Sequence, residues 1–134
     1  KNVIMLPYQP YEDIAQVFSL GDVGLVVSKE NIGDNSVPSK TWNIMAAERP
    51  IIASFDMESE VCSVINRAAC GICVSPNDKE AFKNAILYFY HNRDRGVEMG
   101  INGRQYITEY LTSKQGALRY VKVINDLMGK KIKT

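Results

Sequence analysis

The sequence predicts an α/β fold, a doubly wound parallel sheet, from two observations. Short apolar runs alternate along the chain with stretches of helical periodicity, and turn residues separate them. The apolar runs lack polar alternation, which is typical of parallel strands covered on both faces. The 134 residues, 46% of them hydrophobic and 23% charged, suffice for one domain with a buried core. A net charge of +1 gives no global field that would attract nucleic acid.

Each element is predicted from a local pattern of apolar spacing and of turn residues at its ends. The expected strands are residues 3–6, 23–27, 51–54 and 72–74. The expected helices are residues 11–20, 41–47, 58–69, 79–91, 94–110 and 113–128. Asp78 is the predicted N-cap of the helix at 79–91, and residues 29–37 form a loop without apolar periodicity.

Residues 35–54 combine a loop, a helix start and a buried strand. The polar loop ends in Pro38, Ser39 and Lys40, which can open a helix, and Pro50 ends that helix before the apolar run. Free N–H groups and the positive dipole end of a helix attract anions, phosphate above all. Ser39 would add a hydroxyl donor and Lys40 a full positive charge. In parallel sheets ligands bind at the carboxyl ends of strands, so we expect an anion site here.

The three cysteines, Cys62, Cys70 and Cys73, predict buried thiols rather than a metal site. Their odd number argues against a disulfide framework and suits a reducing compartment. Cys70 and Cys73 have the spacing of half a zinc site, but no second pair exists. The single histidine, His91, falls on another expected helix.

No apolar run approaches the roughly 20 residues that cross a bilayer, and none reads as a signal peptide. The chain does not begin with Met and starts inside an expected strand, so we expect it to be part of a longer protein. Lys130, Lys131 and Lys133 form a basic tail, which we interpret as solvated rather than in contact with lipid headgroups.

Several short motifs occur in a recognisable order along nearly the whole chain. They are residues 23–27, Val37-Pro38-Ser39-Lys40, Met45-Ala46-Ala47, Arg49-Pro50-Ile51-Ile52-Ala53-Ser54, Ser59-Glu60, and residues 70–78 and 99–104. Their order resembles the group 1 glycosyltransferases, the retaining GT-B-type enzymes of family four. The resemblance is greatest to bacterial enzymes that add amino or deoxy sugars in surface-polysaccharide assembly, which carry Pro-Ser-Lys where many relatives carry Gly-Phe-Gly.

The resemblance implies that residues 1–134 are the carboxyl-terminal, Rossmann-like domain that holds the nucleotide-sugar donor. The amino-terminal acceptor domain and the first strand–helix units of this domain would be absent, and the fragment alone would be inactive. The parent enzyme would move a sugar from a nucleotide diphosphate sugar, by family habit a UDP-sugar, to an acceptor in polysaccharide or glycolipid assembly. The scheme requires no metal or other cofactor. It implies a cytoplasmic enzyme and leaves open peripheral association with the inner face of the membrane.

Carried over position by position, the resemblance assigns residues to each part of the donor. The donor phosphates would sit near Ser39, Lys40 and the N–H of Thr41. The nucleobase and ribose would contact Tyr8, Gln9 and Asn43. The donor sugar would contact Asn35 and Ser36. Catalytic residues stay unassigned, because any base on the acceptor side would lie on the absent half.

Three positions depart from the family pattern. Asn35 and Asn43 stand where many members carry a pair of glutamates eight positions apart. Asparagine can hydrogen-bond sugar hydroxyls, but it cannot act as a general base. Glu48 stands where the family usually has glycine, which implies a different helix end or some strain.

Three charged residues have simpler interpretations. Glu60 matches a family glutamate, although it could equally charge the first turn of a helix. Arg104 and Arg119 fall on expected helices far from the carboxyl edge of the sheet, so we predict surface charges.

Two other functions remain open at this point. A nucleotide-sugar epimerase of the same architecture would bind the same donor but leave no transfer product. A non-catalytic α/β module that binds a nucleotide or a protein is favoured somewhat by the two asparagines. Fold alone cannot separate these functions, because doubly wound sheets host many chemistries.

Overall fold

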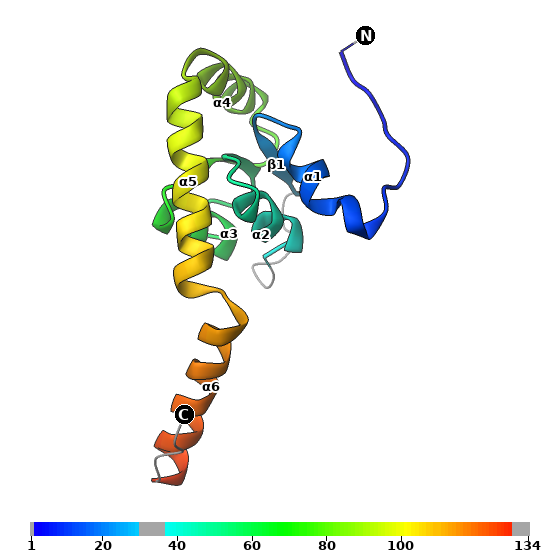
Figure 1. The fold of residues 1–134 in the computed structure, drawn as a ribbon. Helices are drawn as coiled ribbons and strands as arrows, with labels where there is room; N and C mark the ends of the chain where they lie inside the picture. The colour runs from blue at the N-terminus through cyan, green and yellow to red at the C-terminus, as the bar shows by residue number, and fades with distance from the viewer. Residues whose placement is uncertain (1, 30–36, 130–134) are drawn as a thin grey trace.

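A parallel sheet forms the centre of the molecule, and the computed structural model describes residues 2–29 and 37–129 around it (Figure 1). The sheet has three strands in the order β1 (Gly24–Val27), β2 (Ile51–Ser54) and β3 (Gly71–Val74). Both strand pairs are parallel. The predicted α/β class with a parallel sheet is therefore confirmed.

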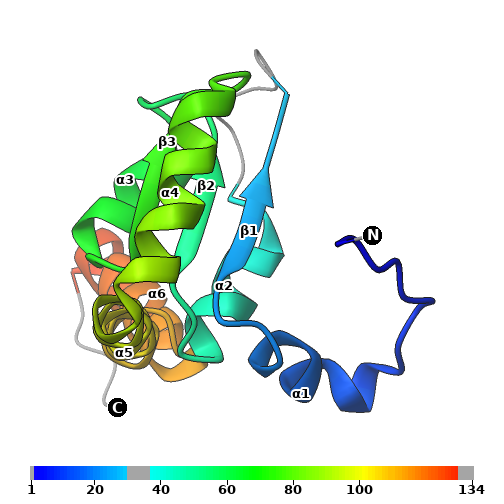
Figure 2. The same cartoon turned by 90° about the horizontal axis from the view of Figure 1, so that it is seen from above.

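Helices cover both faces of the sheet and cross one of its ends (Figure 2). Helices α2 and α3 pack on one face and α4 on the other, while α6 extends from the end of α5 away from the sheet (Figure 1). None of the helices in the described part of the chain is long and apolar enough to cross a membrane. Their bounds are η1 (Tyr11–Asp13), α1 (Ile14–Ser19), α2 (Ser39–Ala46), α3 (Glu60–Arg67), α4 (Lys79–His91), α5 (Arg93–Tyr110) and α6 (Ser113–Met128).

The central strand β2 is buried on both faces. Its Ile51 and Ala53 belong to the core cluster under α2 and α3, whereas Ile52 belongs to the cluster under α4. All three side chains are at most 1% exposed. A continuous apolar run is what such a two-sided position requires, and the strand predicted at 51–54 is confirmed.

Side chains cap three of the helices at their amino ends. The predicted cap is confirmed: Asp78 Oδ1 accepts a hydrogen bond from the N–H of Ala81 at 2.9 Å, and α4 begins at Lys79. Ser59 Oγ accepts from the N–H of Cys62 at the start of α3, and Thr112 caps α6 in the same way. Each cap satisfies one N–H that the first helical turn leaves unpaired.

The strand predicted at residues 3–6 is absent, and that prediction was wrong. The side chains of Val3, Ile4, Met5 and Leu6 are 68% to 88% exposed, and the segment runs apart from the sheet (Figure 2). A strand exists only through hydrogen bonds to a neighbouring strand. Within the described residues β1 pairs with β2 alone, so this apolar segment has no partner.

Helices α2 and α3 end in the same way, with a residue in the left-handed conformation. After α2 the N–H of Arg49 bonds the carbonyl of Ile44 at 3.2 Å, and the N–H of Glu48 bonds that of Met45 at 3.1 Å. This pair of bonds defines a Schellman motif, whose left-handed position glycine usually occupies. Glu48 takes it at a φ of 56°, and Ala69 takes it after α3 at 47°. The strain expected at Glu48 is therefore present.

Replacing Glu48 by glycine is expected to stabilise the protein. The left-handed conformation costs a non-glycine residue about 1–2 kcal/mol, and glycine removes this cost. Glycine also gives the unfolded chain more conformational entropy, which offsets part of the stabilisation. We expect a net increase of about 0.5–1 kcal/mol in the free energy of unfolding, measured by urea denaturation. Glu48→Ala keeps the left-handed strain and serves as the control, which should not show this gain.

Three glycines on α5 let this helix lie against the amino-terminal ends of the strands. Gly96, Gly100 and Gly103 are buried and share one helix face. A Cβ at Gly100 would overlap the backbone carbonyl of Glu48, and one at Gly103 would lie 3.2 Å from the Cβ of Cys70. The absence of side chains at these positions therefore sets how closely α5 approaches α2.

Arg104 is exposed, as the sequence predicted, and it also makes a contact that the sequence did not predict. Its Nη1 donates a short hydrogen bond to the carbonyl of Ala46, in the last turn of α2. A positive group at the end of a helix satisfies a free carbonyl and interacts favourably with the helix dipole. Arg104 thus links α5 to α2 beside the glycine contact.

Candidate functional site

The amino end of α2 lacks the side-chain cap that α3, α4 and α6 have. The residue before the helix is Pro38, which has neither a capping side chain nor an N–H. Within the described residues, the N–H groups of Ser39 and Lys40 have no hydrogen-bond acceptor. Both residues are exposed, and the Lys40 ammonium has no ion-pair partner in that part of the chain. Two N–H groups that lack an acceptor in the described ranges therefore lie together with a cation at the positive end of a helix dipole.

Thr41 differs from its two neighbours. Its N–H already donates to the carbonyl of Pro38 at 2.9 Å, so this group is not free in the structure. Its side chain is fully buried, and Oγ1 has no hydrogen-bond partner among the described residues. Leaving a buried hydroxyl without a hydrogen bond destabilises the folded state. Among the described residues of this helix start, Thr41 Oγ1 is the buried polar atom that lacks a partner.

The remaining predicted residues lie at different distances from this helix start. Asn43 is half-buried on α2 itself, one turn beyond Ser39. Tyr8 is 92% exposed on the segment that precedes η1, and that segment runs away from the sheet (Figure 1). The Gln9 Nε2 donates within the same segment, to the carbonyl of Pro7 at 2.9 Å. The structure therefore brings Asn43 to the helix start but not Tyr8 or Gln9.

Asn35 and Ser36, the residues predicted for the donor sugar, lie outside the described residues.

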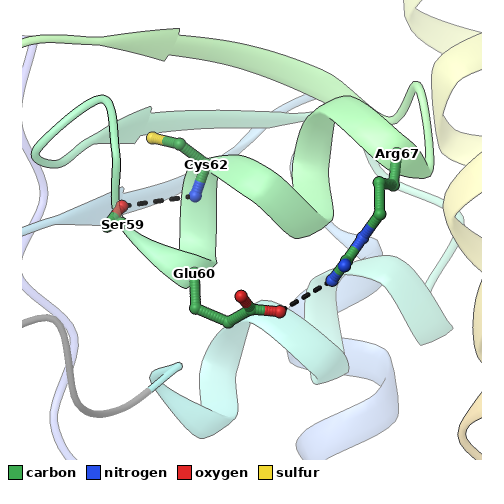
Figure 3. A network of polar contacts seen from close by, with 4 residues as sticks. All are labelled: Ser59, Glu60, Cys62 and Arg67. Carbon is green, nitrogen blue, oxygen red and sulfur yellow. Dashed lines mark hydrogen bonds and ion pairs between the residues drawn. The ribbon is translucent and has the colours of Figure 1, made fainter.

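Helix α3, which follows β2, carries an ion pair between its first and last residues that the sequence did not predict (Figure 3). Arg67 Nη2 lies 2.7 Å from Glu60 Oε1, and the two side chains reach toward each other along one side of α3. The hydrogen bond that Arg67 donates to Glu60 raises the pKa of Arg67 above its ordinary value. Glu60 also lies in the first turn of α3, where a carboxylate suits the helix dipole.

The cysteines lie inside the fold. Cys62 and Cys70 are buried and Cys73 is half-buried, as expected for packed thiols. Burial raises the pKa of the Cys70 thiol to about 12, and burial with a contribution from Cys62 raises that of Cys73 as well. In the described ranges no group of three or more His, Cys, Asp or Glu side chains could hold a metal ion.

The thiol of Cys70 is expected to resist alkylation in the native protein. The thiolate is the reactive form, and a pKa of about 12 in place of 9 lowers its fraction at pH 8 roughly 1,000-fold. Iodoacetamide labelling read by peptide mass spectrometry should therefore be far slower in native than in urea-unfolded protein. Labelling should accelerate as the pH rises toward 12. Equal rates in the two states would contradict the burial of this side chain.

The sequence of the chain is similar to those of glycosyltransferases. The family model described as glycosyl transferases group 1 matches residues 1–106. The chain is 28% identical, over 96% of its length, to WcaI of Escherichia coli K12, named as a candidate glycosyl transferase of colanic acid biosynthesis. It is 35% identical, over 48% of its length, to WbjE of Pseudomonas aeruginosa, named as a candidate glycosyltransferase. The matches span 30% and 16% of these relatives. No solved structure matches the chain significantly.

Proposed function

Because this chain belongs to the group 1 glycosyltransferases, we propose that it is the donor-binding, Rossmann-like domain of a sugar-transferring enzyme. The donor is a nucleotide diphosphate sugar, with UDP as the proposed nucleotide. The acceptor belongs to polysaccharide or glycolipid assembly, a proposal supported by the name of the relative WcaI. The transferred group is a hexose or N-acetylhexosamine, or a deoxy sugar, and the enzyme acts in the cytoplasm.

The uncapped amino end of α2 is the observation that supports this proposal most. The departing diphosphate gains negative charge in the transition state. The N–H groups of Ser39 and Lys40 and the Lys40 ammonium would stabilise that charge without moving, which is electrostatic catalysis by preorganised donors. The third predicted group, the N–H of Thr41, would have to exchange its bond to the carbonyl of Pro38 for one to the phosphate. This scheme requires no metal.

The other donor contacts are proposed from the family pattern. Asn43 would bond the ribose through its amide, which lies on the same helix as Lys40. Tyr8 and Gln9 would contact the nucleobase, and this requires their segment to approach α2 when the donor binds. Asn35 and Ser36 would bond hydroxyls of the donor sugar.

Replacing Lys40 by alanine in the full-length protein is expected to weaken UDP binding. A charged hydrogen bond contributes about 1.5–3 kcal/mol, so the dissociation constant should rise roughly 10- to 150-fold. Calorimetric titration with UDP, UDP-GlcNAc and GDP measures this effect and identifies the nucleotide. Lys79→Ala is a matched control, because Lys79 also opens a helix, but Asp78 already caps that helix. If Lys40→Ala left the UDP affinity unchanged, the phosphate site would have to lie elsewhere in the protein.

A non-catalytic nucleotide-binding module is the second candidate, and Asn43 favours it. Asparagine stands at a position where many family members carry glutamate, so the charged contact of the family pattern is missing at the proposed ribose site. Radiolabelled sugar transfer by the full-length protein separates the two functions. A labelled acceptor product excludes the module. Interconversion of the nucleotide sugar without transfer would identify an epimerase instead.

A further inference from the structure

A groove of about 670 Å³ lies between α2, α3 and the junction of α5 with α6, and the proposed donor contacts leave it unused. Its lining combines three aromatic rings with three charged side chains. The aromatic residues are Trp42, Tyr106 and Tyr110, and the charged ones are Glu60, Arg67 and Arg119. Grooves of this size that mix rings with a few charged groups are typical of small-molecule sites.

Two of the three rings pack against the core, and the third lies against one of them. Trp42 and Tyr106 are partly buried and pack against the core cluster that underlies α2 and α3. Tyr110 is 42% exposed, and its ring centroid lies 5.0 Å from that of Tyr106, with the planes tilted by 47°. Fixed aromatic faces offer contact area at little entropic cost. Pyranose rings, whose axial C–H groups form apolar faces between polar hydroxyl edges, match such a surface.

The charged groups differ in how they are engaged. Glu60 and Arg67 form the ion pair with a separation of 2.7 Å, so their charges balance (Figure 3). Arg119 on α6 has no hydrogen-bond or ion-pair partner among the described residues. Its guanidinium presents a planar fork of donors, which matches the two oxygens of a carboxylate. The groove therefore carries one uncompensated positive charge beside its rings.

We propose that this groove binds a saccharide unit that bears a carboxylate. The sugar ring lies on Tyr106 and Tyr110, its hydroxyls meet the Glu60–Arg67 pair, and its carboxylate pairs with Arg119. The choice of a saccharide rests on the proposed function, whereas the choice of an acidic group rests on the guanidinium of Arg119. The groove opens beside Val37, just before α2, so a saccharide in it would lie next to the proposed phosphate site.

The test is a binding experiment on the full-length protein without a donor. Cellobiouronic acid and cellobiose form a matched pair, because they differ only in a carboxylate in place of a hydroxymethyl group. Calorimetry or saturation-transfer NMR should give at least tenfold tighter binding of the acid. Arg119→Ala should abolish this preference, and Arg119→Lys should restore part of it. Lys122→Ala removes the same charge from α6 outside the groove and should leave the preference intact.

Three outcomes would overturn the proposal. They are equal affinity for the two disaccharides, an acid preference that survives Arg119→Ala, and displacement of the bound acid by UDP. Tyr110→Ala should weaken both disaccharides with an unchanged circular dichroism spectrum, and unaltered binding of both would also contradict the site. The acid should still bind to Lys40→Ala, so failure of the donor site and failure of this groove give different results.

Discussion

Gly100→Ala is expected to lower the free energy of unfolding by about 3 kcal/mol or more. The added Cβ would overlap the carbonyl oxygen of Glu48 and lie 2.7 Å from its carbonyl carbon. Both atoms belong to the backbone of a Schellman motif, so they cannot rotate away as a side chain would. Relief requires α5 to move off α2, which also breaks the bond from Arg104 to Ala46. Overpacking that shifts backbone in this way lies at the upper end of the 1–3 kcal/mol range.

Gly116→Ala is the matched control, because it makes the same change in the interior of another helix. No atom lies within 4 Å of the Cβ that this substitution adds. Alanine is the better helix former by about 1 kcal/mol, so this variant should be slightly more stable than the parent. Urea unfolding followed by the fluorescence of Trp42, the single tryptophan of the sequence, measures both variants. Equal stabilities of the two variants would contradict the close approach of α5.

Met45→Ala should destabilise the protein by about 2–5 kcal/mol. Met45 is fully buried on α2, in the cluster that joins this helix to β2 and α3, and its side chain also contacts the face of α5 at Gly103. Removing it leaves a cavity whose walls belong to several elements, and these cannot all collapse into it. Thermal unfolding measures the loss as a lower melting temperature.

Met45→Leu is the control for this prediction. It nearly conserves the volume of the side chain, so it should cost less than about 1.5 kcal/mol. If the alanine variant lost no more stability than the leucine variant, Met45 would not be part of a close-packed core.

Local patterns predicted most elements, because each depends on residues that are near in sequence. The helix from Lys79 to His91 has its cap at Asp78, and the helix from Ser113 to Met128 has its predicted bounds. Residues 3–6 show the limit of such patterns. Their apolar character indicates a strand, but a strand also needs a partner, and the partner depends on the rest of the sheet.

Contacts between distant residues explain what the sequence did not predict at the site. Pro38, Ser39 and Lys40 indicated a helix start, and the structure has one at Ser39. Arg104 lies at the surface as expected, but its bond to a carbonyl 58 positions earlier in the chain was not predicted. The position of Arg119 in a groove that α3 also lines depends likewise on how α6 leaves α5. No local spacing encodes either arrangement.

The order of the strands has a consequence for how the protein is made. Each strand lies beside the strand that precedes it in the chain, and the register joins Gly24 to Ile51 and Ile51 to Gly71. When β2 or β3 leaves the ribosome, the neighbouring strand with which it pairs has therefore already been synthesised, some tens of residues earlier. The entropic cost of closing such a crossover grows only with the logarithm of its length. The sheet can therefore form strand by strand during translation. Helix α5, which is made later, then packs against the amino-terminal ends of the strands.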